Sequence, residues 1–311
     1  ALGLTEFESE TAFALSLVLE KRFCAKVVTQ QKMQMIRRTG LMEFWPPVPA
    51  DMVGGLDLLK RYLSNRKKAF EPGNEHLPKP KALLLVGIPG TGKSLSCKAA
   101  ATIFGWPLIR LDISALKGSL VGESENNIRQ ATATIDAFGR AVVWLDEIDK
   151  AFGGVKSSSK TDGGTTASMF GCFLTWMQET RSPVLVMATA NNIQELPPEF
   201  LRAGRFDAMF FVDLPTTKER REIVGIMNNR YGSEIPEGYE TQLGGWTGAE
   251  IEQLAKDSLF DGLEEAQKTI VPLSRTMKEE IDSLQQWATT RARWASLLEE
   301  REITKGVRRI K

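Results

Sequence analysis

The residues from Gly87 to Ser94, in the order GIPGTGKS, carry the clearest chemistry of the chain. Glycines at these positions let backbone N–H groups close around a phosphate, where larger side chains would obstruct them. Lys93 can then reach the β- and γ-phosphates of a nucleotide, and the hydroxyl of Ser94 can bind Mg²⁺. The apolar run Ala82–Val86 precedes this loop and a helix-like segment follows it. The order predicted is therefore strand, phosphate loop and helix, with the positive end of the helix dipole facing the phosphates.

Two adjacent carboxylates form a second motif, at the end of the apolar segment Ala141–Leu145. Asp146, at the tip of this expected strand, can hold Mg²⁺, and Glu147 can orient and deprotonate an attacking water. Alone, the pattern also fits an ordinary strand that ends in surface acids. Because it follows a phosphate loop, we interpret the pair as a sign of hydrolysis rather than of nucleotide binding alone.

The elements that must position these motifs are predicted by the pattern between residues 82 and 214. Strand-like apolar runs alternate there with helical stretches, and Gly105 and Gly139 fit helix C-caps. Such alternation predicts an α/β fold with a parallel sheet covered on both faces, and ligands bind at the carboxyl ends of its strands. The expected strands are Ala82–Val86, Leu108–Leu111, Val142–Leu145, Val184–Ala188 and Met209–Val212.

Helices dominate the rest of the chain. Two are expected within residues 4–38, before a proline-rich linker at 43–49, and a third at Leu56–Phe70. The basic face of this third helix fits either a solvated surface or a phosphate contact. The stretch Gly153–Gly164, rich in glycine and serine, predicts a loop after the two carboxylates. After Pro215 only helices are expected, which indicates a separate helical subdomain. These helices are Thr217–Tyr231, Gly248–Gln267 and Lys278–Glu300.

The composition is that of an ordinary globular protein. Of 311 residues, 42% are hydrophobic and 25% are charged, and the net charge of +1 gives no overall signal for nucleic acid. Three cysteines, Cys24, Cys97 and Cys172, lack metal-ligand spacing and fit a reducing compartment. No apolar run approaches the ~18 residues of a transmembrane helix, and no secretory leader is predicted. Because the chain begins at Ala1 without methionine, we expect it to be part of a longer protein.

Further segments, in the correct order, resemble motifs of the AAA subgroup of AAA+ ATPases. The match covers about residues 50–265. It comprises Val53–Leu56 (VGGL, beside adenine), Gly122–Glu125 (GESE, after the central-pore loop), Ala188–Asn191 (ATAN, a strand tip that positions water), Leu201–Asp207 (LRAGRFD, the arginine-finger segment) and Thr247–Glu250 (TGAE, in the lid). The resemblance implies a P-loop NTPase (AAA+) with a parallel-sheet core and a C-terminal α-helical lid subdomain. It also implies ATP and Mg²⁺ as cofactors.

Longer phrases indicate one branch of this family. The stretches GIPGTGKSLSCKA, FGCFLTWMQE and VPLSRTM resemble the poorly characterised AAA ATPase encoded in cyanobacteria and some algal plastid genomes. Members of that branch have an additional N-terminal domain. The implied domains are residues 1–45, the end of an N-terminal helical region and a linker, 46–215, the α/β ATPase core, and 216–311, the helical lid. The implied location is the cytoplasm, or the plastid stroma if the protein is plastid-encoded.

The resemblance also assigns the nucleotide site. Asp146 and Ser94 would hold Mg²⁺, and Glu147 would activate the attacking water. Asn191 would position that water, with its neighbour Asn192 as the alternative. The nucleotide-binding residues implied are Val53, Gly54, Gly90, Thr91, Gly92, Lys93, Ser94, Leu95, Gly248 and Ala249, of which Val53, Gly54, Gly248 and Ala249 surround adenine.

Two arginines imply an assembly. Arg202 and Arg205 match the arginine fingers, which stabilise charge on the transferring γ-phosphate. In this fold they face the site of a neighbouring copy, so the resemblance implies a head-to-tail ring, a homo-hexamer. The alternative is that they are two surface arginines on a loop.

The implied pore loop, Lys117–Val121, departs from the family pattern. Relatives that thread polypeptide usually carry an aromatic residue where Leu120 falls, and leucine offers less contact area. Lys117, Leu120 and Val121 are the residues expected to meet a cargo, although Leu120 could instead pack within its own domain. The stretch Lys117–Ser119 suits a nucleic-acid backbone equally well.

We therefore expect a hexameric ATPase that remodels a macromolecular cargo, protein or nucleic acid, through its central pore, without a membrane partner. One alternative is a nucleic-acid-binding ATPase with the same core, which strongly salt-dependent binding would identify. The other is a nucleotide-controlled scaffold without translocation, which slow hydrolysis unaffected by any polymer would identify. The sequence contains no HExxH motif, which argues against a fused zinc protease.

Overall fold

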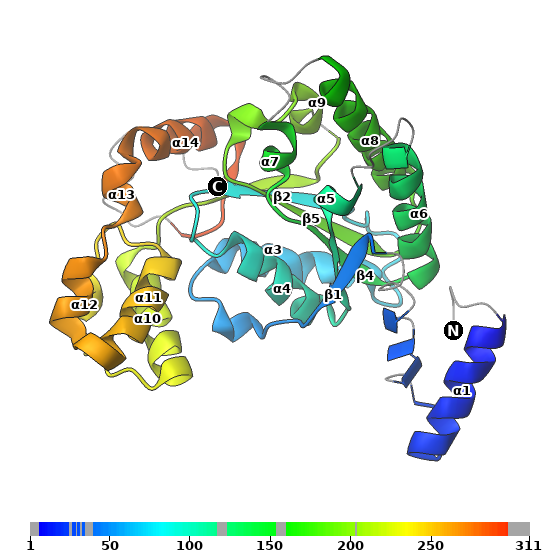
Figure 1. The fold of residues 1–311 in the computed structure, drawn as a ribbon, viewed down its shortest axis with the longest axis horizontal. Coiled ribbons are helices and arrows are strands. Elements are labelled where there is room, and N and C mark those ends of the chain that lie inside the picture. The colour runs from blue at the N-terminus through cyan, green and yellow to red at the C-terminus, as the bar shows by residue number, and fades with distance from the viewer. Residues whose placement is uncertain are drawn as a thin grey trace.

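The computed structural model describes residues 6–24, 27–28, 30–31, 33–34, 40–116, 123–153, 160–202 and 204–297. Its described part is built around a seven-stranded sheet in the order β1-β3-β4-β5-β2-β6-β7 (Figure 1). All neighbours are parallel except β1 and β3. The strands are β1 (Met42–Trp45), β2 (Ala82–Gly87), β3 (Leu108–Leu111), β4 (Ala141–Leu145), β5 (Val184–Ala190), β6 (Ala208–Val212) and β7 (Arg293–Trp294). The predicted α/β fold is confirmed, and its central strands are parallel as expected. The prediction of a linker from residue 43 was wrong for residues 43–45, because β1 pairs there with β3 as an antiparallel edge strand.

Helices cover both faces of the sheet, which is why its central strands are almost wholly apolar. Every residue of β2, β4 and β5 is buried, as expected for parallel strands packed on both sides. Neighbouring side chains of β2 belong to opposite faces, with Leu83 in one apolar cluster and Leu84 in the other. The covering helices are α3 (Asp57–Lys67) and α4 (Lys93–Phe104) on one face, and α6 (Glu123–Phe138) and α8 (Lys160–Glu179) on the other.

Three neighbouring strands bring the chemical motifs to one edge of the sheet. β4, β5 and β2 run parallel, with Leu145 opposite Ala188 and Val86 opposite Ala190. Their carboxyl ends therefore meet. The phosphate loop follows β2, the two carboxylates follow β4, and Asn191 follows β5.

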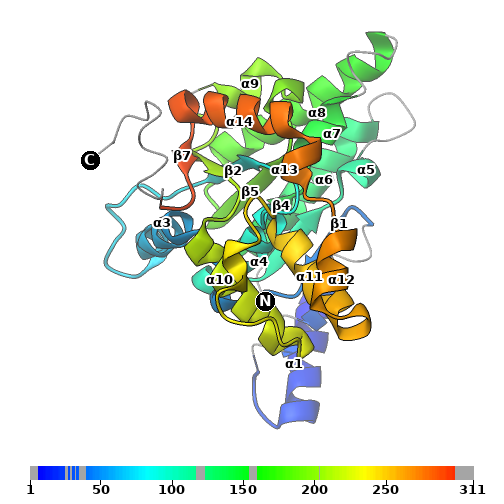
Figure 2. The same ribbon diagram turned by 90° about the vertical axis from the view of Figure 1, so that its left-hand side faces the viewer.

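A helical unit with its own core follows β6 and lies to one side of the sheet (Figures 1 and 2). Its elements are α10 (Thr217–Tyr231), α11 (Gly248–Asp261), α12 (Leu263–Thr269) and α13 (Leu273–Thr276). Capping boxes fix the starts of α10 and α11, where the hydroxyls of Thr216 and Thr247 each accept a backbone N–H. The apolar core of this unit includes Ile223, Trp246 and Leu254.

The segment after α13 returns to the core sheet, against the expectation of helices alone after Pro215. α14 (Lys278–Arg291) ends before the predicted Glu300, and the next residues form β7, which pairs with β6. The ring of Trp294 meets that of Phe211 edge-on at 5.2 Å, and the N–H of Ala295 donates to the carbonyl of Phe211 at 2.9 Å. These contacts join residues far apart in the sequence, so no local pattern could predict them.

Two carboxylates of α10 hold the segment that precedes α3. Glu219 Oε1 accepts the N–H of Leu56 at 2.9 Å, and Glu222 Oε2 accepts the N–H of Gly55 at 2.8 Å. Glu219 is buried, and its Oε1 also accepts the hydroxyl of Ser296 at 2.5 Å. The helical unit and the sheet domain are therefore joined by these hydrogen bonds as well as by the chain itself.

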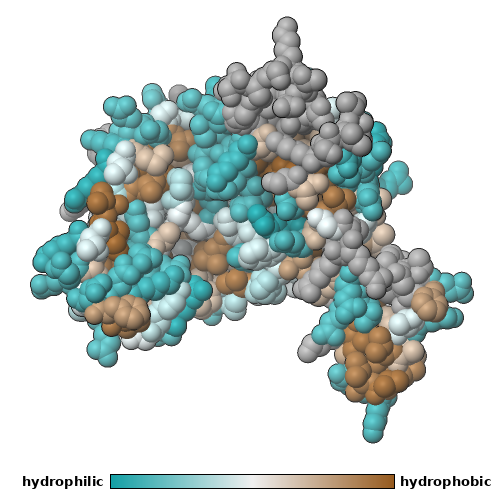
Figure 3. Space-filling model, in the orientation of Figure 1, coloured by the Kyte–Doolittle hydropathy of each residue, from teal (hydrophilic) through white to brown (hydrophobic). Residues whose placement is uncertain are grey.

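At the N-terminal side, α1 (Glu6–Glu20) is the first of the two helices expected within residues 4–38, and much of the second falls on residues outside the description. Large apolar side chains of this region are exposed and show brown in Figure 3. They include Phe7, Leu17, Val18, Leu19 and Phe23. None of the described helices combines the length and apolar character needed to cross a bilayer.

The remaining elements are short. They are α5 (Ile113–Leu116), α7 (Ile148–Gly153), α9 (Pro198–Leu201) and the 3₁₀ turns Ala50–Met52, Lys68–Phe70, Ile193–Glu195 and Tyr239–Thr241. α8 begins at Lys160, inside the stretch predicted as a loop, and residues 154–159 lie outside the description.

Candidate functional site

The phosphate loop joins β2 to α4 through backbone shapes that favour glycine. Gly90 and Gly92 have φ angles of +78° and +94°, in the left-handed region. At Gly87 an added Cβ would lie 2.0 Å from the carbonyl oxygen of Val212 on the neighbouring strand, so no larger residue fits there. α4 begins at Lys93, and its first N–H groups are therefore available to phosphate oxygens.

Lys93 lies within this loop. Its ammonium donates to the carbonyl oxygens of Gly87 at 2.8 Å and Ile88 at 2.7 Å. The residue is 6% exposed, and burial lowers its pKa to about 8. A bound polyphosphate would oppose that shift, because negative charge favours the ammonium form.

Asp146 is where α4, β4 and β5 meet. Its Oδ1 accepts hydrogen bonds from Ser94 Oγ at 2.9 Å and Thr189 Oγ1 at 2.7 Å. Thr189 Oγ1 also accepts the backbone N–H of Glu147 at 2.8 Å, which fixes the turn after β4. Mg²⁺ prefers oxygen ligands and usually binds one or two protein carboxylates together with water and phosphate oxygens. Ser94 and Asp146 therefore fit the metal of a nucleotide–Mg²⁺ complex.

The carboxylate of Glu147 has a partner on each oxygen. Asn191 Nδ2 donates to Oε1 at 3.0 Å, and Lys150 Nζ lies 2.6 Å from Oε2. The hydrogen bond from Lys150 is the main reason that the pKa of Glu147 lies below its ordinary value. The backbone of Glu147 has a φ of +49°, which is uncommon for a residue other than glycine. An ionised carboxylate held in this way can accept a proton from water.

The structure separates the two candidate asparagines. The side chain of Asn191 reaches Glu147, whereas Asn192 Oδ1 accepts the N–H of Gln194 at 3.0 Å and caps the 3₁₀ turn that follows β5. The buried Asp149 Oδ2 accepts the backbone N–H groups of both, at 3.1 and 2.9 Å. Only Asn191 is therefore brought to the carboxylate.

Sequence reasoning missed Lys150 and Asp149. Lys150 stands three residues after Glu147, in the first turn of α7, and the tight turn between β4 and α7 brings the two side chains together. The spacing of three residues was present in the sequence as a signal. Asp149 depends on the turn after β5, which is distant in the chain, so no local signal identified it.

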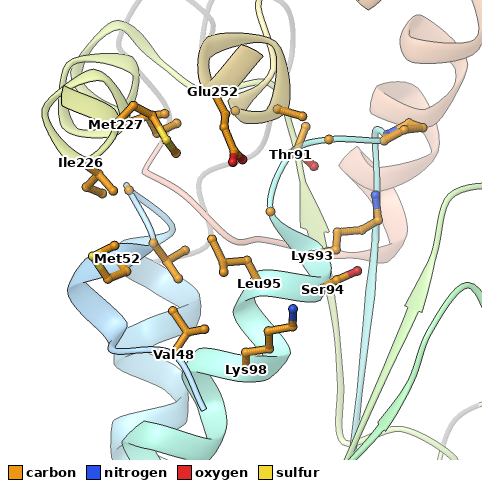
Figure 4. A pocket seen from close by; sticks show the side chains of 18 of the residues that line it. Val48, Met52, Thr91, Lys93, Ser94, Leu95, Lys98, Ile226, Met227 and Glu252 are labelled. Atoms are coloured by element: carbon orange, nitrogen blue, oxygen red, sulfur yellow. The ribbon is translucent and has the colours of Figure 1, made fainter. Parts of the chain in front are cut away.

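A cavity of about 680 Å³ extends from the phosphate loop to the helical unit (Figure 4). At Gly54 an added Cβ would lie 2.6 Å from Ile223 Cγ1, so a small residue is required. The N–H of Ala249 donates to the carbonyl of Gly90 at 3.0 Å, which ties α11 to the phosphate loop. All four residues predicted to surround adenine line this cavity: Val53, Gly54, Gly248 and Ala249. So do the loop residues Gly90, Thr91, Gly92, Lys93, Ser94 and Leu95.

The cavity has an apolar end that sequence reasoning missed. Figure 4 shows Val48, Met52, Ile226 and Met227 at the side opposite Lys93. An apolar end of this kind suits a flat aromatic base. These residues come from the linker, the turn before α3 and the helical unit, so only the fold brings them together.

The two predicted arginine fingers lie outside the lining of this cavity. Arg202 is exposed, and Arg205 is partly buried and donates from Nη1 to Gln178 Oε1 on α8 at 3.1 Å. Neither is among the described residues that line the cavity. The predicted pore residues fall on a segment outside the description: Lys117, Leu120 and Val121.

Comparison of the sequence with known proteins gives a family. Residues 83–214 match the ATPase family associated with various cellular activities (AAA). The uncharacterized AAA domain-containing protein ycf46 of Pyropia yezoensis is 43% identical over 291 residues, which is 87% of this chain and 59% of that relative. The ycf46 protein of Guillardia theta is 40% identical over 282 residues, 85% of this chain and 55% of that relative. The chain therefore spans little more than half the length of these curated relatives.

A solved structure is also similar. The AAA domain of FIGL-1 in complex with ADP superposes with a TM-score of 0.64, at 20% sequence identity, and the match covers 85% of this chain and 97% of that one. At this identity the likeness shows a shared fold. The resemblance to AAA ATPases that the sequence motifs predicted is confirmed.

Proposed function

Residues 83–214 are an AAA ATPase domain, and we propose that the chain hydrolyses ATP with Mg²⁺, as a homo-hexamer, to remodel a macromolecular cargo. The observation that carries this proposal is the meeting of three strand ends. Ser94 lies against Asp146, Asn191 lies against Glu147, and both pairs adjoin the loop that contains Lys93. A phosphate anchor, a metal pair and a base with its orienting amide are the groups that hydrolysis requires.

The proposed reaction uses these groups in order. The loop N–H groups and Lys93 hold the β- and γ-phosphates, and Ser94 and Asp146 would hold Mg²⁺, which neutralises charge on the phosphate oxygens when bound. Glu147, oriented by Asn191, accepts a proton from water as the water oxygen attacks the γ-phosphorus. The bond between that phosphorus and the bridging oxygen to the β-phosphate breaks, and ADP and phosphate leave.

The ring is proposed from the arginines. An exposed Arg202, and an Arg205 outside the lining of its own cavity, support a role at a neighbouring site. In a closed head-to-tail ring, each copy would place these guanidinium groups against the γ-phosphate held by the next. The proposed domains are residues 1–45, 46–215 and 216–311, with β1 of the first and β7 of the last joining the sheet of the second.

The cargo is proposed to pass the pore loops of the ring, Lys117–Val121, in the cytoplasm or, for a plastid-encoded chain, in the stroma. Light scattering with ATP measures the assembly, and phosphate release with unfolded protein, single-stranded DNA or RNA identifies the polymer. We expect a hexamer whose ATPase rate rises with one polymer class. Glu147→Gln is the control for contaminating ATPases. A monomer with full activity, or a rate unchanged by every polymer, would contradict the remodelling function.

A further inference from the structure

Glu252 stands between the two unlike ends of the cavity. Figure 4 shows its carboxylate projecting from α11 into the space between Met227, at the apolar end, and Thr91, in the phosphate loop. A nucleotide with its base at the apolar end and its phosphates in the loop has its ribose between them. Leu95 lies on the opposite side of this space, so the sugar would lie between an apolar side chain and a carboxylate.

The neighbours of Glu252 fix its position and leave it able to bind more. Its Oε1 accepts a short hydrogen bond from the hydroxyl of Tyr231 and lies 2.9 Å from Lys256 Nζ and 3.6 Å from Arg230 Nη1. These three contacts all fall on Oε1. A carboxylate has about four acceptor sites, so Oε2 can accept a hydrogen bond from a ligand.

The charge of Glu252 limits what that ligand group can be. Desolvation raises its pKa, but the hydrogen bonds from Tyr231 and Lys256 outweigh it and leave the pKa below its ordinary value. An ionised carboxylate accepts hydrogen bonds and repels phosphate. The groups of a nucleotide that donate hydrogen bonds between base and phosphates are the ribose hydroxyls.

We propose that Glu252 accepts a hydrogen bond from the ribose diol of the bound nucleotide and thereby selects ribonucleotides over deoxyribonucleotides. This inference rests on the proposed function, since it places a nucleotide in this cavity. Selection follows because a deoxy analogue leaves Oε2 of the partly desolvated carboxylate without this hydrogen bond, which weakens binding by more than the lost contact alone.

Calorimetric titration of the full chain with ATP, 2′-deoxy-ATP and 3′-deoxy-ATP, each with Mg²⁺, tests the proposal. At least one deoxy analogue should bind about tenfold more weakly than ATP, as expected for a hydrogen bond to a charged group. In Glu252→Ala, ATP should bind as weakly as that analogue, so that discrimination disappears. Glu252→Gln keeps the side-chain volume and loses the charge, and it should reduce the discrimination without unfolding the helical unit.

Lys256→Met is the matched control, because it removes the ion-pair partner and leaves the carboxylate. This variant should still bind ATP more tightly than the deoxy analogue. If Lys256→Met loses that discrimination, the effect comes from the packing of α11, and the proposal is overturned. Equal binding of all three nucleotides to the unaltered chain would overturn the ribose contact and leave the ATPase proposal standing. No binding of any nucleotide would overturn the ATPase proposal itself, and the ribose contact with it.

Discussion

Asn191 donates a 3.0 Å hydrogen bond from its side-chain amide to Glu147, across 44 residues of the chain. One residue follows β5 and the other follows β4, so the register of two neighbouring strands sets this contact. Lys150 holds the other carboxylate oxygen, at 2.6 Å. Lys93 takes part in neither contact, and its ammonium donates to the carbonyl oxygens of Gly87 and Ile88. The proposed binding of phosphate and the proposed activation of water therefore rest on different side chains.

Glu147→Gln should keep nucleotide binding and stop turnover. Glutamine retains the shape and the contact with Asn191 but cannot accept a proton from water, so phosphate release should fall by about 10²- to 10⁴-fold. Lys93→Ala removes the buried cation of the phosphate loop and should abolish binding. Titration with ATP and a phosphate-release assay on both variants check this. Near-normal turnover in Glu147→Gln would show that Glu147 is not the general base.

ATP binding near pH 8 should take up a proton at Lys93. Burial lowers the pKa of this lysine to about 8, so about half of it is neutral there, and bound phosphates restore the ammonium form. Titrations at pH 8 in buffers of different ionisation enthalpy should show uptake of up to about half a proton, and at pH 6.5 almost none. Lys93→Arg, which stays charged, is the control. Equal uptake at both pH values would refute this assignment.

The same pKa shift should affect stability without nucleotide. Lys93 has a folded pKa of about 8 against an ordinary 10.5, so the unfolded chain binds more protons between these values. The contribution of Lys93 to the free energy of unfolding is therefore least favourable below pH 8, and it increases as the pH rises towards 10.5. Lys93→Met should flatten this part of the stability–pH curve, as measured by denaturant unfolding.

Arg205→Ala should bind ATP normally and hydrolyse it poorly if this arginine acts on a neighbour. Mixed with Lys93→Ala subunits, it should recover activity above the sum of the two separate samples. The reason is that an interface between an intact phosphate loop and an intact Arg205 can form in the mixed ring. Mixtures with no gain, from variants that still assemble, would place the arginine outside the shared site.

Gly87→Ala should destabilise the sheet. The new Cβ would lie 2.0 Å from the carbonyl oxygen of Val212, so β2 and β6 would have to separate, at a cost of about 1–3 kcal/mol or more. Gly225→Ala, in α10, meets no atom within 4 Å and should stabilise the helix by up to about 1 kcal/mol. Urea unfolding of both variants measures the difference. Equal effects would show that β2 tolerates a side chain there.

Local motifs predicted the site better than its surroundings. Lys93, Asp146 and Asn191 each stand beside a strand in a short pattern, and the sheet order brings them together. Trp294 belongs to a two-residue strand whose partner is far away in the chain, and no periodicity marks it. Glu252 fits any helix surface in the sequence, and only the packing of α11 over the cavity distinguishes it. The positions of Trp294 and Glu252 depend on contacts between segments that are distant in the chain, so the sequence did not predict them.

The hydrogen bonds from Gly55 and Leu56 to Glu222 and Glu219 have a mechanical consequence. Breaking one of these hydrogen bonds would leave a buried N–H group without an acceptor, at a cost of about 1–3 kcal/mol. If the helical unit moves, the start of α10 should therefore stay with the sheet domain. For such a movement, the start of α10 would be the pivot. The hydrogen bond from Ala249 to Gly90 would pass a change at the phosphate loop to α11, and α12, at the far end of the helical unit, would be displaced most. A small adjustment at the phosphates would thus become a large displacement at the rim of the molecule.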